Sequence, residues 1–532
     1  MAPFVLSDRA AHSLPLVLAV VRVLFGLMIV HQMLDIFGFA MLPGGPDPRV
    51  ARLISALAAI GGAMLALGAL TPLAVVGLLI YYALFPLAFN LGTMVTVALL
   101  WGLLLHGAGR THSLDALLLR SRLAGTWMAR FYAPFGAGGR QEIAGVRLMV
   151  MLMFWGNCIT AMLYHVKDPF WLNGQVLQMA FTASYLTDHH AFMAALREQH
   201  PRFFMAFCQL GLAIQAVWEV CLVPLMYLKW ARPFVVLQGL GFFTFSLLLL
   251  NLQYLPVVEL LLWTLLFGPA ILGWVREKWR QEAPAPAGEE PAPAVAPLTI
   301  ARHLPTLIGL TCGAVVVQNA VAPGLMPTEL AKPMKPIHQA LAPYYRLFGQ
   351  EVVNVFNQGD IGMNEAYFVV QEVDPAGRHR RIVPFYDHEG GRLDYMRNDL
   401  LYFKYSLKWQ RAKREHKFIA GDPARPAAPT RQLAFRVALL DAVMTDVTRP
   451  RQYRAHVYVR QMRLDTTPPR WTQPQRAGSF PLTITSAHLS RFRAMRWPTF
   501  DLPPGHAFSR ERLQQTEEAF RKVDAAAPKP AP

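Results

Sequence analysis

Thr111–Leu118 (THSLDALL) and Tyr164–Gly174 (YHVKDPFWLNG) decide the fold, because each of these polar stretches lies directly beside long apolar runs. In membrane proteins, charged and indole side chains at such places cap helices, anchor them at the interface or form a site. A soluble protein has little reason to place them beside segments able to cross a bilayer. The two stretches therefore predict a membrane protein.

Composition supports this prediction. Hydrophobic residues make up 54% of the 532 residues and charged residues only 16%, whereas about a quarter of a typical soluble domain is charged. Residues 325–532 differ from the rest, with 32 Lys and Arg against 20 Asp and Glu. A basic domain beside a membrane favours anionic lipid headgroups. The four cysteines lie in apolar runs without metal or disulfide spacing.

Nine apolar segments approach the roughly 20 residues that a transmembrane helix requires. The second and third are joined only by the turn at Thr71-Pro72, so a single re-entrant pair is the alternative there. The first segment lacks the cleavage pattern of a signal peptide and is expected to remain as a span. The predicted spans are 14–40, 53–70, 72–89, 92–107, 145–165, 203–227, 233–250, 255–275 and 304–322.

Basic residues predict the orientation, since Lys and Arg near span ends stay in the cytoplasm. Three connections are basic: 108–144, the turn containing Lys229 and Arg232, and 276–303. Because successive spans alternate in direction, all three lie on the same side of the membrane. We therefore expect a protein of the cell (inner) membrane with a cytoplasmic N-terminus and an extracytoplasmic C-terminal domain. Its expected partners are the lipid bilayer and an extracytoplasmic protein client, and this location excludes nucleic acid.

The predicted fold is a polytopic α-helical membrane bundle of about nine spans with a C-terminal soluble α+β domain. Within that domain, 367–374 and 380–387 form an expected hairpin about Pro375-Ala376-Gly377, and 452–463 an expected strand. Arg454 and His456 are predicted on the wet face of that strand. The predicted parts are a membrane domain 1–275, a cytoplasmic Pro/Ala-rich linker 276–303, a last transmembrane helix 304–323, an extracytoplasmic domain 324–500 containing helices 398–416 and 430–446, and a disordered tail 501–532. Residues 166–200 suit an amphipathic helix at the outer interface.

Four short patterns, in order along residues 14–275, resemble the HTTM (horizontally transferred transmembrane) domain, which vitamin K-dependent gamma-carboxylases share with bacterial relatives. They are Val21–Met28, Ser113–Ala116, Lys167–Gly174, and Trp218-Glu219 with Pro224. The resemblance implies a membrane quinol as co-substrate, deprotonated by a lysine near the start of the third pattern, here Lys167. It also marks Gly26, Ser113, Asp115 and Gly174 as motif residues. The resemblance leads us to expect a histidine after Asn90. Leu91 and Gly92 are found there instead, so carboxylation of peptide glutamate is not expected.

The candidate catalytic residues are Lys167 and Glu219. Lys167 would act as a base if it is desolvated; the alternative is a lysine at a span end, paired to Asp168. Glu219 shares a helix face with Gln215, and such an intramembrane carboxylate is either functional or paired, with Arg22 as the candidate partner. The expected cavity residues are His165, Asp168, Trp171, Gln215 and Arg22.

Other polar residues have simpler interpretations. His31 and Asp35 are spaced for a proton relay or an interfacial hydrogen bond, and the second is favoured. Asp115 is expected to cap a helix beginning near Leu117. His165, His189 and His190 would make a metal site only if folding brought them together, so no metal is expected.

Three functions remain. The first is a carboxylase-like membrane enzyme acting with a quinol or another lipid. The second is a non-enzymatic, membrane-anchored maturation or binding factor. The third, a transporter, is the least supported, because the sequence has no repeated halves.

Overall fold

The computed structural model divides the chain into two compact units. The bundle unit contains residues 1–167, 213–248 and 254–354, and the second unit contains residues 168–212, 249–253 and 355–532. The structure describes residues 2–39, 48–85, 92–121, 125–135, 139–182, 187, 189–250, 252, 254–279, 303–322, 325, 327–350, 364–374, 376, 378–383, 451–463, 470–472, 475–484, 514–515 and 517–518. The predicted linker and tail lie almost wholly outside these ranges, as does the region of the predicted helices 398–416 and 430–446.

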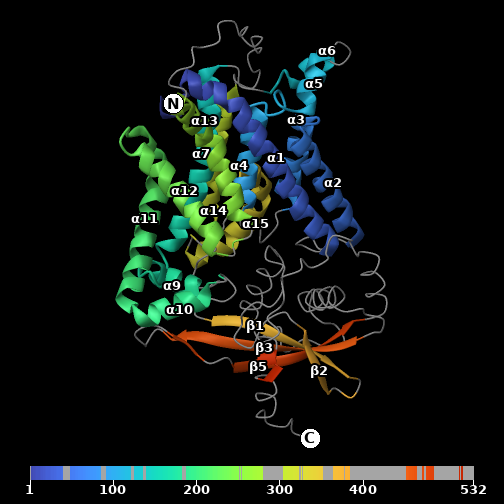
Figure 1. Cartoon of the computed structure of the whole chain (residues 1–532), viewed down its shortest axis with the longest axis vertical. Coiled ribbons are helices and arrows are strands. Elements are labelled where there is room, and N and C mark those ends of the chain that lie inside the picture. Colours follow the sequence, from blue (N-terminus) through green and yellow to red (C-terminus); the bar gives the residue numbers. More distant parts are fainter. Residues whose placement is uncertain are drawn as a thin grey trace. The chain divides into compact units, whose positions relative to one another are not determined.

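The bundle unit consists of helices that run side by side (Figure 1). Its long apolar helices are α1 (Asp8–Phe39), α7 (Arg140–His165), α11 (Pro201–Tyr227, which begins in the second unit), α12 (Arg232–Leu249), α13 (Leu255–Trp279) and α14 (Leu304–Val321). Its shorter helices are α2 (Pro48–Leu67), α3 (Thr71–Leu84), α4 (Thr93–Leu105), α5 (Leu114–Arg120), α6 (Gly125–Tyr132) and α15 (Thr328–Leu347), after the single turn η1 (Ala2–Phe4). α1 packs along α2 and α13, while α7 packs against α4 and α14.

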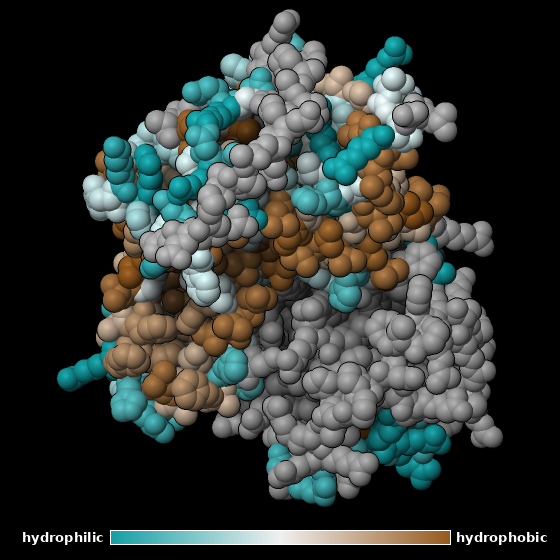
Figure 2. Space-filling view, turned by 45° about the horizontal axis from the view of Figure 1, so that its top comes forward, coloured by the Kyte–Doolittle hydropathy of each residue, from teal (hydrophilic) through white to brown (hydrophobic). Residues whose placement is uncertain are grey.

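Six of these helices are long and apolar enough to cross a membrane: α1, α7, α11, α12, α13 and α14. Each of the nine predicted segments contains a helix within its described residues, but α2, α3 and α4 are apolar over only 10–17 residues, which is short for a span. In Figure 2, hydrophobic side chains gather in a broad region on the helical part, with hydrophilic side chains toward one end. The chain is therefore a helical membrane bundle with six candidate spans in the described residues.

Glycines allow α1 and α2 to approach closely. A Cβ atom at Gly26 would lie 2.5 Å from the backbone nitrogen of Ala66 and 2.6 Å from the carbonyl oxygen of Gly62. A Cβ atom at Gly62 would in turn lie 2.9 Å from the side chain of Ile29. Small residues are favoured where membrane helices cross closely, because association there depends on backbone contact. This crossing explains Gly26 of the first motif in physical terms.

The end of α15 is fixed to the bundle by a set of side-chain donors, which we call the latch. Trp101 of α4 donates its indole N–H to the carbonyl of Leu347 over 2.8 Å. Asn157 of α7 donates to the carbonyl of Gly349 over 2.7 Å, and the buried Gln350 donates to the carbonyl of Met153 over 2.8 Å. The bundle unit thus includes α15 and the residues that follow it.

Residues 166–200 were predicted as one amphipathic helix, but the structure shows three short helices: α8 (Pro169–Leu172), α9 (Gln175–Thr182) and α10 (His190–Gln199). Gly174 separates the first two with φ +74°, a left-handed conformation that interrupts a helix and favours glycine. A Cβ atom there would also lie 2.7 Å from the side chain of Gln209. The apolar faces of α9 and α10 pack with the start of α11 around Phe181, Met193, Phe204 and Cys208.

The described part of the C-terminal region forms an antiparallel sheet. Its strands are β1 (Asn364–Val373), β2 (His379–Val383), β3 (Arg451–Arg463), β4 (Arg470–Trp471) and β5 (Gln475–Ile484). β1 pairs with β2 and with β3, and β3 also pairs with β4 and β5. The β1–β2 pairing confirms the predicted hairpin, and β3 confirms the predicted strand.

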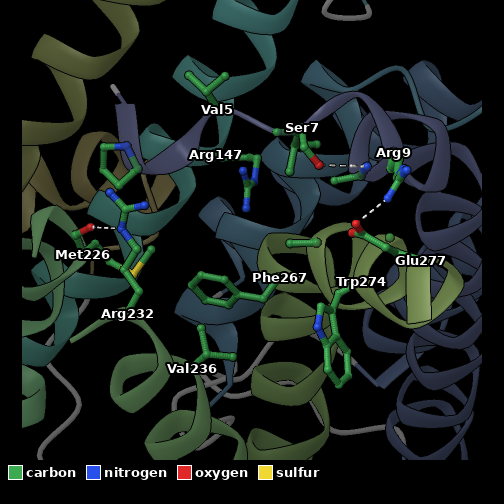
Figure 3. A pocket seen from close by; sticks show the side chains of 15 residues that line it. Val5, Ser7, Arg9, Arg147, Met226, Arg232, Val236, Phe267, Trp274 and Glu277 are labelled. Carbon is green, nitrogen blue, oxygen red and sulfur yellow. Dashed lines mark hydrogen bonds and ion pairs between the residues drawn. The ribbon is translucent and has the colours of Figure 1, made fainter. Parts of the chain in front are cut away.

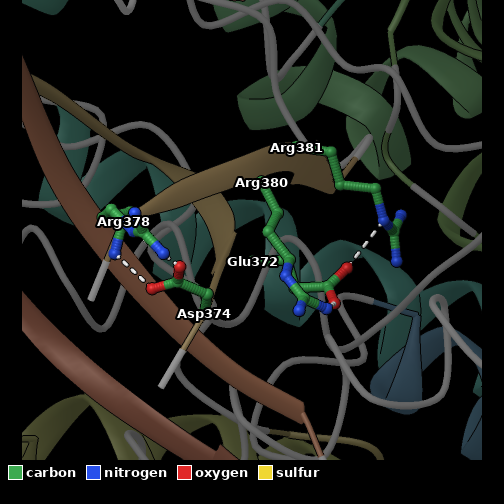
Figure 4. A network of polar contacts seen from close by, with 5 residues as sticks. All are labelled: Glu372, Asp374, Arg378, Arg380 and Arg381. Carbon is green, nitrogen blue, oxygen red and sulfur yellow. Dashed lines mark hydrogen bonds and ion pairs between the residues drawn. The ribbon is translucent and has the colours of Figure 1, made fainter. Parts of the chain in front are cut away.

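Polar contacts hold this hairpin together (Figure 4). At the turn, Asp374 accepts hydrogen bonds from the backbone N–H and the guanidinium of Arg378, both over 2.8 Å. The backbone N–H of Arg378 is the first cause, and its guanidinium a further one, that lower the pKa of Asp374. Across the strands, the buried Glu372 pairs with Arg381 over 2.8 Å and with Arg380 over 3.7 Å.

The prediction that His456 lies on a wet face was wrong. Arg454 is exposed, as expected, but His456 on the same face is buried to 2% exposure. Its neighbour across the sheet is Val369, which is buried together with the adjacent Val370. Because successive residues point to opposite faces, both faces of the sheet are covered at this point.

Candidate functional site

Arg22 organises the junction between α2, α3 and α5. Its guanidinium donates to the carbonyls of Leu65 and Ala66 over 2.8 and 3.0 Å, and to the carbonyl of His112 over 2.8 Å. The first two are at the C-terminal end of α2, where a cation complements the unpaired carbonyls. Arg22 therefore binds backbone carbonyls at this junction. It does not pair with Glu219, for which the sequence analysis gave it as the candidate partner.

Asp115 completes the junction from the other side. It is fully buried, and its carboxylate accepts hydrogen bonds from the backbone N–H groups of Leu70 and Thr71 over 2.7 and 2.8 Å and from the Thr71 hydroxyl over 2.9 Å. The hydroxyl of Tyr132 donates to the same carboxylate. Burial, and then this bond, raise the pKa of Tyr132, so the hydroxyl remains a donor.

The expected cap of the helix near Leu117 is Ser113 rather than Asp115. Ser113 precedes α5 and accepts a hydrogen bond from the backbone N–H of Ala116 over 2.9 Å. Asp115 instead caps α3, which is adjacent only in space. The sequence analysis expected Asp115 to cap the helix that follows it and could not show that its partners belong to a different helix.

Glu219 lies in α11 beside Gln215, as the spacing predicted. The side-chain amide of Gln215 donates to Glu219 Oε1 over 2.7 Å. Gln215 is buried and Glu219 half-buried, on the side of α11 opposite the exposed Leu210 and Val217. The carboxyl group therefore turns toward the bundle and has a polar partner there.

The sequence analysis missed Glu259, which is buried in α13. Its carboxyl group interacts electrostatically with that of Glu219, and both interact with the thiol of Cys158 in α7. We call Gln215, Glu219 and Glu259 the acidic cluster. The rule that singled out Glu219, a carboxyl group inside an apolar run, applies equally to Glu259 and could have found it.

The helices that carry the acidic cluster also contribute packed aromatic side chains. Trp218 of α11 and Trp263 of α13 lie with ring centroids 5.5 Å apart, and Phe154 of α7 is within 6.1 Å of both. The two indoles donate to backbone carbonyls of α12, those of Val235 and Val236, each over 3.0 Å. All three rings are buried, so they form an apolar core between α7, α11 and α13.

Lys167 is placed elsewhere. Its side chain is exposed, and its ammonium donates to the backbone carbonyl of Leu325 over 2.9 Å. Within the described residues, Lys167 forms no hydrogen bond or ion pair with the acidic cluster. His165, two residues earlier, is buried at the end of α7.

The remaining motif residues lie in the second unit. Asp168 and Trp171 are buried, and the backbone carbonyl of Asp168 accepts a hydrogen bond from the N–H of Trp171 over 3.1 Å. Gly174 makes the close approach to Gln209 described above. The stretch Tyr164–Gly174 is thus divided between the two units. Lys167 belongs to the bundle unit, and Asp168, Trp171 and Gly174 belong to the second unit.

Of the other candidates, His31 contacts the ring and hydroxyl of Tyr254, whereas the side chain of Asp35 lies outside the described residues. Within the described ranges, no group of three His, Cys, Asp or Glu side chains could hold a metal ion. No protein-family model, curated protein or solved structure matches this chain.

Proposed function

We propose that the bundle is a membrane enzyme that binds a lipid-soluble substrate carrying hydroxyl groups, such as a membrane quinol, at the acidic cluster. The class of substrate is the one that the resemblance to the HTTM domain implies. The proton-accepting group in this proposal is Glu219, in place of Lys167. The exposed Lys167 lacks the burial that a lysine requires to act as a base.

The observation that carries the proposal is an excess of buried acceptors. In the described part of the chain, Glu219 Oε2 and Gln215 Oε1 are buried and have no hydrogen-bond partner. A buried acceptor left without a donor costs about 1–3 kcal/mol. A quinol supplies two hydroxyl donors and a flat ring suited to the aromatic surroundings, and its isoprenoid tail would reside in the lipid.

The chemistry requires only a proton transfer. A carboxylate of the cluster accepts the hydroxyl proton, so that the O–H bond breaks and the negative charge moves to the substrate oxygen. The second carboxyl group favours this step, because two carboxylates close together in apolar surroundings repel each other until one accepts a proton.

The orientation expected from the sequence is part of the proposal. The N-terminus would be cytoplasmic and the C-terminal region, as an α+β domain, extracytoplasmic. This region would then be available to a protein substrate or client outside the cell membrane.

The test is the quinone content of the purified full-length protein, measured by mass spectrometry after extraction. We expect bound quinone in the wild type and roughly tenfold less in Glu219→Gln and Glu259→Gln, the loss that a weakened hydrogen bond to a charged group produces. Glu329→Gln is the matched control, since Glu329 is exposed in the first turn of α15.

Equal quinone content in all four proteins, or none in the wild type, would contradict the proposal. That result would favour the alternative function, a non-enzymatic factor whose helical bundle serves only as a membrane anchor.

A further inference from the structure

A cavity of about 330 Å³ lies at the end of the bundle where the N-terminal segment meets α7, α11, α12 and α13 (Figure 3). Its lining includes both basic and apolar side chains. Arg147 of α7 and Arg232 of α12 supply positive charge, while Phe267 and Trp274 of α13 supply apolar surface. It is distinct from the acidic cluster, none of whose residues lines it.

Arg147 is held rigidly at the cavity. It is only 3% exposed, and its guanidinium donates to the backbone carbonyls of Phe4 and Leu266. Carbonyl oxygens orient a guanidinium without neutralising it. Two of these bonds go to Leu266 and one goes to Phe4. Since a guanidinium carries five N–H donors, two N–H groups remain available.

Arg232 offers more free donors. Its Nε donates to the carbonyl of Met226, at the end of α11, over 2.8 Å. Neither of its two terminal nitrogens has a hydrogen bond recorded in the described residues. The guanidinium is thus oriented through one nitrogen, with the other two available to a ligand.

Among the described residues that line the cavity, the one carboxylate, Glu277, is already paired. Glu277 forms an ion pair with Arg9 over 2.5 Å, and both side chains are more than half exposed. In the described part of the chain, neither Arg147 nor Arg232 forms an ion pair. Two positive charges therefore share this partly buried cavity without a counter-charge, which is unfavourable unless an anion is bound.

The apolar wall limits what that anion can be. Trp274 is 59% exposed near the end of α13, and Lys278 lies over its ring at 5.3 Å from the centroid. A tryptophan beside a lysine at a span end is typical of the level of lipid headgroups. Phe267 and Val236 continue the apolar lining into the cavity.

We infer that this cavity binds the phosphate headgroup of an anionic phospholipid. The phosphate oxygens would accept hydrogen bonds from Arg147 and Arg232, a geometry for which guanidinium groups are well suited. The acyl chains would leave along Phe267 and Trp274. Free inorganic phosphate shares the headgroup chemistry but makes no use of the apolar wall.

The experiment uses the purified full-length protein in a mild detergent. Phosphatidylglycerol, phosphatidylcholine or inorganic phosphate is titrated in, and the shift in melting temperature is followed while native mass spectrometry counts bound lipid. Arg232→Gln removes free donors and charge. Val236→Trp fills the cavity but keeps both arginines, and Arg130→Gln, exposed on α6, is the charge-matched control.

We expect phosphatidylglycerol to bind wild type and Arg130→Gln alike, with about tenfold weaker binding to Arg232→Gln and Val236→Trp. Phosphatidylcholine and inorganic phosphate should bind weakly to every protein. A response to inorganic phosphate that matches or exceeds the lipid response would overturn the lipid assignment. Equal binding of phosphatidylglycerol by all four proteins would overturn the site itself.

Discussion

Replacing Asp115 by alanine should destabilise the bundle more than any other single change in the Ser113–Ala116 motif. The fully buried carboxylate accepts hydrogen bonds from two backbone N–H groups and one hydroxyl, all within 2.9 Å, and from Tyr132. Each buried donor left without a partner costs about 1–3 kcal/mol. Water entering the vacated space recovers part of this, so we expect a loss of about 3–5 kcal/mol in the free energy of unfolding.

The assay is equilibrium unfolding in mixed micelles, with SDS as the denaturant and tryptophan fluorescence as the signal. Ser113→Ala is the matched control, because Ser113 caps α5 and donates to the nearby carbonyl of Gly109 but, within the described residues, makes no bond to α3. Losing such a cap costs about 1 kcal/mol. If Asp115→Ala costs no more than Ser113→Ala, the four-way acceptor role assigned to Asp115 is refuted.

Three further predictions concern other parts of the chain. Gly26→Ala should cost about 1–3 kcal/mol in the same unfolding assay, because its Cβ would meet the backbone of α2, whereas Gly77→Ala, with nothing within 4 Å, should be neutral or stabilising. The pKa of Asp374 is lowered by its bonds from Arg378, so its contribution to the hairpin should be complete above the unfolded value of about 3.9 and be lost as pH falls through the lower folded value. Hydrogen exchange at the Arg378 amide should show that loss, and Asp374→Asn should abolish its pH dependence. Reporter fusions after Pro327 and after Arg280 should lie on opposite sides of the membrane, and two cytoplasmic reporters would show that the predicted orientation is wrong.

The apolar runs predicted the helices well, because composition alone determines which segments can enter a bilayer. Length is harder to read. The run that became α2 continues in hydropathy into the run that became α3. The sequence predicted a turn at Thr71-Pro72, but only the structure shows that α2 already ends at Leu67 and that Leu70 is left-handed.

The candidate site was predicted in part. The face shared by Gln215 and Glu219 follows from helical spacing, so the sequence was sufficient there. The proximity of Glu219 and Glu259 depends on how α11 packs relative to α13. The spacing of residues within one helix does not determine that packing. The roles of Arg22 and Asp115 were missed for the same reason, since their partners are 17 to 90 residues away in sequence.

The latch has a mechanical consequence. A pull on the C-terminal region would reach the bundle through Gln350, whose bond to Met153 lies one residue from the bond between Gly349 and Asn157. Both bonds attach to α7, so the load would pass to a span in the middle of the bundle and would not peel α15 away first. A pull on the C-terminal region would therefore reach the bundle before α15 unwinds.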